Sequence, residues 1–157
     1  MTMTLSDAGV TFPDTSVQAK SAQGPAFSAY QTAAQSLPNS TFTKLNLGLE
    51  EFDTANAFDT TNSRFQPTVA GYYSLQGEVG MAATGLLVLA LYKNGVEFKR
   101  GNQLNGNAIA VNSAFFVYLN GTTDYVELWI YQTTGGSVNT SAAAAFTYFS
   151  GFLARAA

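Results

Sequence analysis

The stretch Tyr125-Val126-Glu127-Leu128-Trp129-Ile130-Tyr131 decides the class of fold. Every second residue from Val126 is aliphatic, and aromatic rings fill most of the positions between. Successive side chains of a strand point to opposite faces of a sheet, so this pattern predicts a β-strand that is apolar on both faces. An antiparallel strand with one wet face alternates apolar and polar residues instead. The second face therefore needs a cover. Loops and the N-terminal segment could provide it, but we expect the packing of identical subunits.

The same composition recurs along the chain in short runs separated by turn residues. Leu86–Tyr92 and Phe146–Leu153 are also apolar on both faces, and Asn94-Gly95 is a strong hairpin signal. No segment sustains a capped helical stripe, so we expect an all-β sandwich or jelly roll. The other predicted strands are Ala26–Tyr30, Thr41–Leu45, Arg64–Val69, Tyr72–Val79 and Ala108–Leu119.

Composition excludes several classes of function. Of 157 residues only 11% are charged, where about 25% is usual, which again favours a surface covered by partner chains. With 0 Cys and 0 His, the chain has no thiol nucleophile, disulfide, histidine base or histidine metal site. No Gly-x-Ser-x-Gly elbow or phosphate loop occurs, so we expect a non-enzymatic protein without a cofactor or metal. The net charge of −3 argues against nucleic acid.

We also expect neither export nor membrane insertion. The start of the chain has neither a basic region nor an apolar run, and so does not resemble a signal peptide. The most apolar stretch, Met81–Tyr92, is about half of the roughly twenty residues that a spanning helix needs.

Residues 1–24 differ from the rest and are interpreted as an N-terminal anchoring arm and linker, followed by a head at 25–157. The run from Ser21 to Pro25 is typical of a linker. A segment this short cannot bury enough surface to fold alone, so it must pair with another surface. The candidate anchoring residues are Leu5, Val10, Phe12 and Val17.

From Pro25 onward the chain resembles the globular head of complement subcomponent q, a branch of the tumour-necrosis-factor-like jelly rolls. The pieces follow the family's order over about 130 residues, although Leu119–Val126 carries two residues more than the family's Leu…Gly-Asp-x-Val turn. The matching pieces are Pro25–Ala29, Phe58–Phe65, Val69–Leu75, Leu91–Gly95, Leu119–Val126 and Tyr148–Leu153.

This resemblance implies a ten-stranded antiparallel jelly-roll sandwich of two five-stranded sheets that forms a homotrimer. It places Leu86–Tyr92 in the outer sheet, and Tyr125–Tyr131 with Phe146–Leu153 in the sheet that forms the trimer interface. The candidate interface residues are Tyr125, Trp129, Tyr131, Phe146, Tyr148 and Phe152.

The N-terminus departs from the animal family, because no Gly-x-y collagen repeat precedes the head. Instead, Leu5–Gln18 resembles a segment of bacteriophage fibre and virion-surface proteins. That implies a virion structural protein, assembled in the host cytoplasm, with a phage capsid or tail and baseplate protein as partner. We expect capsid decoration, as a cement protein or head fibre. A short tail fibre that contacts a host surface glycan is the alternative, and a lectin-like binding module is a second.

Two further features admit two interpretations each. The acidic run Glu50-Glu51-Phe52-Asp53 could ligate calcium, but an exposed polar loop is the simpler interpretation. Trp129 and the neighbouring tyrosines could form a sugar-stacking platform. Because they alternate with core residues in one strand, we assign them to the core and the trimer interface instead.

Overall fold

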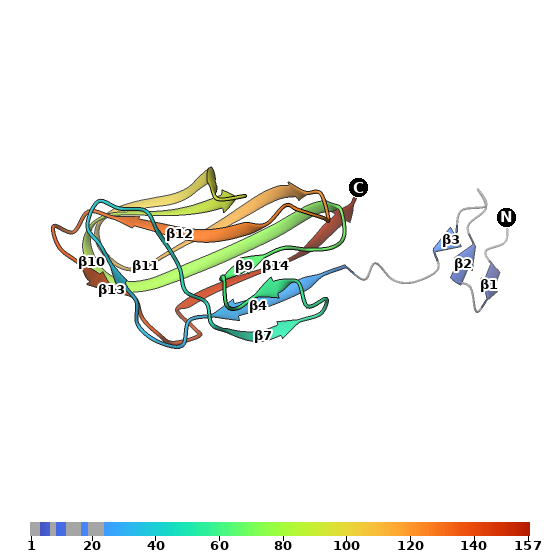
Figure 1. The fold of residues 1–157 in the computed structure, drawn as a ribbon, viewed down its shortest axis with the longest axis horizontal. Coiled ribbons are helices and arrows are strands. Elements are labelled where there is room, and N and C mark those ends of the chain that lie inside the picture. The colour runs from blue at the N-terminus through green and yellow to red at the C-terminus, as the bar shows by residue number, and fades with distance from the viewer. Residues whose placement is uncertain (1–3, 7–8, 12–16, 19–23) are drawn as a thin grey trace.

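The computed structural model describes residues 4–6, 9–11, 17–18 and 24–157. Every regular element within these ranges is a strand (Figure 1), which confirms the all-β prediction. The strands are β1 (Thr4–Ser6), β2 (Gly9–Thr11), β3 (Val17–Gln18), β4 (Ala26–Tyr30), β5 (Ser36–Leu37), β6 (Thr43–Lys44), β7 (Leu49–Asp53), β8 (Phe58–Asp59), β9 (Arg64–Phe65), β10 (Gly71–Lys93), β11 (Val96–Leu119), β12 (Val126–Gln132), β13 (Val138–Asn139) and β14 (Thr147–Ala156).

One long hairpin, β10–β11, runs through both layers of the head. The pairing extends from Gly71 opposite Leu119 to Lys93 opposite Val96, with a register shift between Gly80 and Ala83. On its other side β10 pairs with β14 along its first half and with β12 along its second half. The predicted strands Tyr72–Val79 and Leu86–Tyr92 are therefore one strand that passes from sheet to sheet. The small residues between them bend the strand and do not end it.

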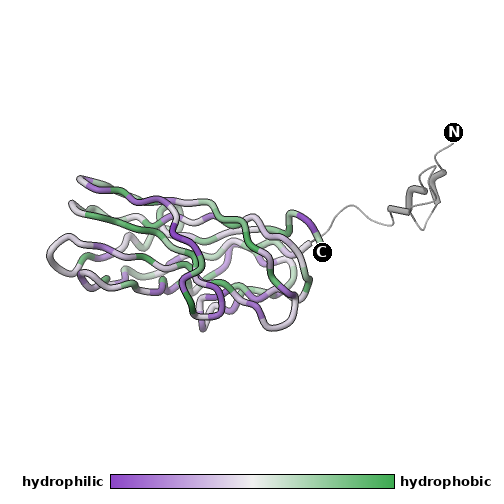
Figure 2. Tube along the Cα trace, turned by 90° about the horizontal axis from the view of Figure 1, so that it is seen from above, coloured by the Kyte–Doolittle hydropathy of each residue, from purple (hydrophilic) through white to green (hydrophobic). Residues whose placement is uncertain are grey.

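The hairpin divides the head into two sheets, which Figure 1 and Figure 2 show as two layers. The first sheet has the order β7, β4, β14, first half of β10, second half of β11. The second sheet contains the other halves of β10 and β11 with β12, β6, β9 and β8.

The core lies between the two sheets and is built from alternate strand positions. In the first half of β10 the odd-numbered residues, such as Tyr73 and Leu75, are buried, while their even-numbered neighbours face outward. The second sheet contributes Leu87, Leu89 and Leu91 from β10 and Val126, Leu128 and Ile130 from β12. Phe27 stacks on Phe65 with 4.2 Å between ring centroids and so joins the two layers at one end.

The pairing corrects one implication of the resemblance. We expected Tyr125–Tyr131 and Phe146–Leu153 to lie in one sheet, but β12 belongs to the second sheet and β14 to the first. Leu86–Tyr92 pairs with β12, in the sheet that does not contain β14, and its place in the outer sheet of a trimer stays a prediction.

The structure also corrects our explanation of the doubly apolar strands in the second sheet. Val88 and Ala90 point away from the core, yet they are already 1% and 0% exposed in the single chain. Phe42 packs near them against Tyr92 and Tyr131, with ring centroids 6.0 and 5.0 Å apart. The chain itself therefore covers Val88 and Ala90, while the rings of Trp129 and Tyr131 stay partly exposed.

The arm contains a small antiparallel sheet of order β1-β2-β3. Leu5 pairs with Val10, and Thr11 pairs with Val17, so three of the candidate anchoring residues lie in strands. Their side chains, and all of Phe12, lie outside the described part of the structure.

Candidate functional site

The outward surface of the first sheet carries the largest exposed aromatic side chains of the head. We call this surface the open face. On β10, β11 and β14 the rings occupy even-numbered positions, while odd-numbered positions form the core, which fixes the direction of the rings. Phe52 lies on β7, a strand without a buried residue. Phe116 and Phe152 are both 54% exposed. The exposed rings of the open face are Phe52, Tyr72, Phe116, Tyr118 and Phe152.

The register of the sheet brings these rings together. Tyr72 lies directly opposite Tyr118, and Ser74 lies between Phe116 on one side and Phe152 on the other. The Tyr72 ring is nearly parallel to that of Phe116, with centroids 6.1 Å apart. Cross-strand contacts of this kind hold the rings in place on a rigid sheet.

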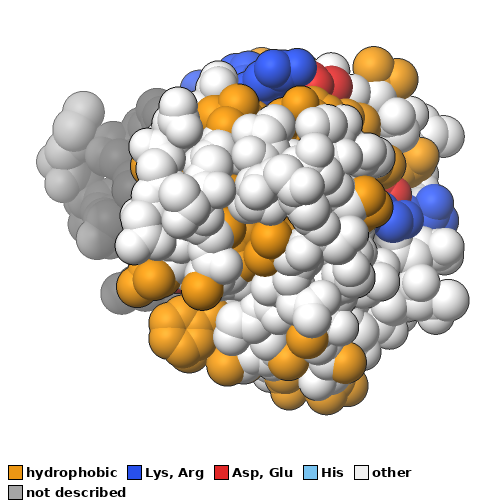
Figure 3. Space-filling view, turned by 90° about the vertical axis from the view of Figure 1, so that its left-hand side faces the viewer, with side chains coloured by type: hydrophobic (Ala, Val, Ile, Leu, Met, Phe, Trp, Pro, Cys, Tyr) orange, Lys and Arg blue, Asp and Glu red, His pale blue; other side chains and the backbone are white. Residues whose placement is uncertain are grey.

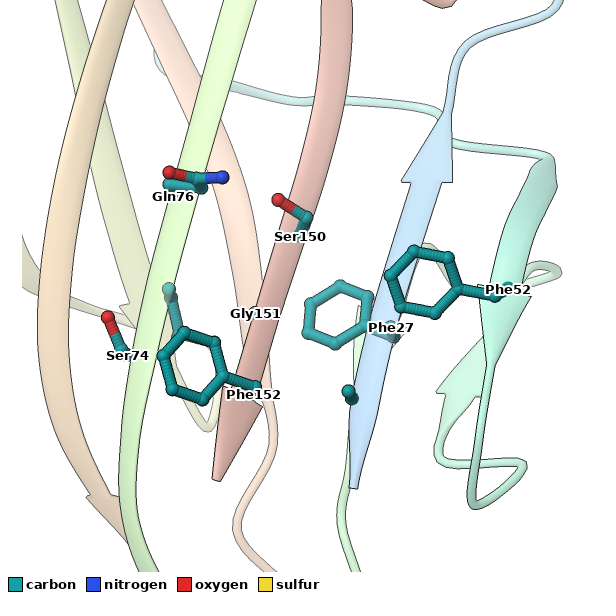
Figure 4. Close-up of a pocket in the computed structure, with 9 residues that line it drawn as sticks. Phe27, Phe52, Ser74, Gln76, Ser150, Gly151 and Phe152 are labelled. Atoms are coloured by element: carbon teal, nitrogen blue, oxygen red, sulfur yellow. The ribbon is translucent and has the colours of Figure 1, made fainter. Parts of the chain in front are cut away.

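A shallow groove of about 220 Å³ crosses the open face between Phe52 and Phe152. Figure 4 shows the two rings beside the groove, with Ser150 and Gly151 of β14 between β10 and β4. Residue 151 points toward the core, where a Cβ would lie 2.4 Å from Leu75 Cδ2, so glycine is required. Small outward side chains, such as Ser150 and Ser74, leave the hollow above the sheet open.

The groove offers apolar contact and a few hydrogen bonds. Its polar side chains are Ser74, Gln76 and Ser150, and no charged residue lines it. Tyr148 and Glu78 pair on β14 and β10 in the same sheet. Burial, with a further contribution from Glu78, raises the pKa of Tyr148. Such a surface suits packing against another protein surface.

The acidic run lies within β7, a strand where we expected an exposed polar loop, and two of its carboxylates serve structural roles. Glu51 accepts a hydrogen bond from the Ser28 hydroxyl at 2.8 Å, and Asp53 accepts from the backbone N–H groups of Ala55 and Phe58. Burial, followed by the charge of Asp53, raises the pKa of Glu50. In the described residues no three acidic side chains come together as a metal site.

The structure separates the six predicted interface residues. Only Tyr148 and Phe152 lie on the open face. Phe146 lies just before β14 and packs beside Gly80, where the long hairpin bends. Tyr125, Trp129 and Tyr131 belong to the outer surface of the second sheet. The Arg64 guanidinium lies over the Tyr125 ring, 4.8 Å from its centroid.

Four rings of the open face were missed from the sequence: Phe52, Tyr72, Phe116 and Tyr118. The signal was present in Tyr72-Tyr73-Ser74-Leu75 and Phe115-Phe116-Val117-Tyr118, where exposed and buried rings alternate. The doubly apolar pattern indicated β12 as the interface strand instead. Its outer rings, Trp129 and Tyr131, pack against Tyr92 and Phe42 of the same chain.

Figure 3 shows, from one end of the sandwich, how unevenly side chains are distributed. Apolar side chains lie along the lower side of this view and also at its top and upper right, while Lys and Arg lie at the top and right, next to acidic groups. On the face seen here, the lower side is apolar without visible charged side chains.

Solved structures with the same architecture identify the fold. Murine APRIL aligns with a TM-score of 0.64 and 12% identity, over 83% of this chain and 99% of that one. The globular domain of the zebrafish complement 1qA protein gives 0.56 and 17% identity, over 85% and 99%. The head is a tumour-necrosis-factor-like jelly roll.

The same comparison includes a component of a phage particle. The vertex protein P5 of PRD1 aligns with a TM-score of 0.64 and 13% identity, over 83% of this chain and 97% of that one. No family model matches the sequence, and no curated protein resembles it closely enough to be matched. In the described part of the chain, no helix has the length and apolar character to cross a membrane.

Proposed function

We propose that the protein is a non-enzymatic structural component of a phage particle, a homotrimeric knob held to the particle by its N-terminal arm. The observation that carries this proposal is the open aromatic face, on a fold shared with the PRD1 vertex protein. Contiguous exposed rings on one sheet are unusual for a monomer in water and mark a surface that another protein covers.

The occupant of the open face in this proposal is a second copy of the chain. The family resemblance implies a homotrimer, and the low charge of the chain agrees with a surface covered by partners. The groove between Phe52 and Phe152 takes an apolar side chain of the neighbouring copy, because its walls are rings and its few polar groups are uncharged.

The arm supplies the link to the particle. Three arms joined by one trimer bind a symmetric site far more tightly than a single arm, since the later contacts form at high effective concentration. The anchoring residues in this proposal are Leu5, Val10, Phe12 and Val17. In this proposal the knob decorates the capsid, as a cement protein or head fibre.

Light scattering of the purified chain tests the trimer. We expect a mass of about three times 16.6 kDa at micromolar concentration. The double variant Tyr72→Ser, Phe116→Ser removes two stacked rings of the open face and should yield a folded monomer. Phe98→Ser is the matched control, because Phe98 is 42% exposed but lies in the other half of β11. A wild-type monomer, or a trimer that survives the double variant, contradicts the proposed interface.

A further inference from the structure

Three Asn-Gly pairs occur in the chain, and they begin at Asn94, Asn105 and Asn120. In such a pair the backbone nitrogen of the glycine can attack the side-chain amide carbon of the asparagine, because glycine has no Cβ to hinder the approach. The structure holds the three asparagines in different ways. We propose that Asn105 is a site of spontaneous covalent modification, where the asparagine is converted through a cyclic imide into aspartate and isoaspartate.

Hydrogen bonds hold two of the three side chains. Asn94 Nδ2 donates to Asp124 Oδ1 at 2.8 Å, and Asn94 Oδ1 accepts from the Tyr125 N–H at 3.0 Å. Asn120 Oδ1 accepts from the backbone N–H groups of residues 122–124 at 2.9–3.0 Å. These contacts must break before either amide carbon can turn toward the following glycine nitrogen, so the fold protects both asparagines.

Asn105 lies on β11 without such contacts. Its side chain is exposed and makes no hydrogen bond to the described part of the chain. Gly106 has φ 130°, and no atom lies within 4 Å of an added Cβ. Gly106 pairs with Gly85, which has φ 152°, and two facing glycines weaken the ladder at this point. Within the described head β10 is the only strand paired with β11, so a local opening here breaks few bonds.

The reaction requires only water as a co-reactant. The Gly106 nitrogen forms a bond to Asn105 Cγ, the Cγ–Nδ2 bond breaks, and ammonia leaves with the proton of the Gly106 amide. Water then opens the cyclic imide. Addition at one carbonyl gives aspartate, and addition at the other gives isoaspartate, whose main chain continues through Cγ. The net change replaces a neutral amide by a carboxylate, and alkali accelerates it because the attacking amide must lose its proton.

The modification changes charge and backbone length at one point of the second sheet. It adds one negative charge to a chain whose net charge is −3. Isoaspartate also lengthens the main chain by one methylene, which disturbs the register of β11 against β10 beside Leu86. Asn105 lies in the half of β11 that belongs to the second sheet, whereas Phe116 and Tyr118 of the open face lie in the other half. The inference therefore does not rest on the proposed function, and either can fail alone.

Mass spectrometry of the full-length protein, aged in mildly alkaline buffer, tests the proposal. Chymotrypsin cleaves after Phe115 and so separates Asn105 from Asn120, and fragmentation of the peptides distinguishes aspartate from isoaspartate. We expect both products at Asn105, formed at least about tenfold faster than at Asn94 or Asn120, because those two sites react only after a larger opening. In urea all three pairs should react at similar rates, since the hydrogen bonds that distinguish them are gone.

Variants separate the site from its surroundings. Asn105→Gln should remove the major acidic form that isoelectric focusing detects in the aged protein. Asn107→Gln is the matched control, because Asn107 is exposed on the same strand but precedes Ala108, and it should leave that form unchanged. Asp124→Ala removes the acceptor of Asn94 Nδ2 and should accelerate the reaction at Asn94 but not at Asn105.

The products and their rates decide the inference. An unmodified Asn105, or equal rates at the three pairs in the folded protein, overturns it. Aspartate without isoaspartate also overturns it, because direct hydrolysis does not pass through the imide. An unchanged rate at Asn94 in Asp124→Ala contradicts the protection by hydrogen bonds. Circular dichroism checks the fold of each variant, and the light-scattering mass of the same samples before ageing reports separately on the trimer.

Discussion

At the residue scale, Tyr73 combines a buried ring with one hydrogen bond from its hydroxyl. Its ring is fully buried, and its hydroxyl donates to the Val69 carbonyl at 2.7 Å. Burial raises the pKa of Tyr73 to about 12. A phenol titrates near 10 in the unfolded chain, so this residue's contribution to stability is complete below about pH 10 and is lost as the pH rises toward 12.

We predict that Tyr73→Phe lowers the free energy of unfolding by about 1 kcal/mol at pH 7, since the hydrogen bond to the Val69 carbonyl is lost. Between about pH 10 and 12 the variant should lose less stability than the wild type does, because it has no phenol to ionise at this site. Urea unfolding at pH 7 and in alkali measures both effects. A variant as alkali-sensitive as the wild type would assign the alkaline loss to the other tyrosines.

Asp124 fastens the tip of the long hairpin to the loop before β12. Its carboxylate accepts from Asn94 Nδ2 at 2.8 Å and from the Asn120 N–H at 3.1 Å, and lies 2.8 Å from Lys93 Nζ. Burial by itself raises the pKa of Asp124, but the hydrogen bonds from Lys93 and Asn94 outweigh it, so the net pKa is lowered. A lowered pKa contributes stability above the unfolded value, near 4, that is lost as the pH falls through the folded value.

We therefore expect Asp124→Asn to cost about 1–3 kcal/mol of unfolding free energy at pH 7 and much less in acid, once the pH has fallen below the lowered pKa of Asp124. Chemical unfolding across this pH range measures the difference. Glu97→Gln is the control, because its partner Arg100 is exposed and such pairs contribute less than about 1 kcal/mol. A loss for Asp124→Asn that is the same at both ends of the range would assign it to packing alone.

At the scale of single elements, two glycines with positive φ distinguish the cost of a left-handed backbone from the cost of a steric clash with an added Cβ. Gly121 has φ 71°, and a Cβ there would lie 2.4 Å from the backbone nitrogen of Ala70. Gly135 has φ 90°, with no atom within 4 Å of a Cβ. Gly135→Ala should cost only about 1–2 kcal/mol for the left-handed backbone. Gly121→Ala should cost clearly more, because it also displaces the neighbouring segment; thermal unfolding of the two variants compares them.

The sequence allowed the elements to be predicted better than their partners. Short β-rich runs located all or part of the longer head strands β4, β10, β11, β12 and β14 but missed β7. Asn94-Gly95 correctly marked the hairpin, where both residues adopt positive φ. The continuity of β10 was missed because Ala82-Ala83-Thr84-Gly85 has a composition typical of a break, while the ladder to β11 resumes at Ala83. Pairing between distant segments, such as β4 with β14, decides which rings share a sheet, and no local pattern carries that information.

At the scale of the whole molecule, two aromatic surfaces lie on opposite sheets and differ in chemistry. Sequence alone placed Trp129 and Phe152 in one interface, but the fold separates them onto the second and first sheets. The open face is uncharged where it is hollow, whereas the outer rings of the second sheet are bordered by the pairs of Lys44 and Arg100.

The arm provides the last prediction at this scale. Deleting residues 1–20 removes β1, β2 and β3 but leaves every strand of the two head sheets, so the truncated chain should keep the oligomeric mass of the full chain. It should no longer join the particle, because the avidity of three arms is gone. Co-sedimentation with particles assembled without the wild-type chain measures incorporation. A chain in which residues 1–20 are replaced by a Gly/Ser segment of equal length separates the effect of arm sequence from that of arm length. Normal incorporation of the truncated head would show that the head itself holds the particle and that the arm is not the anchor.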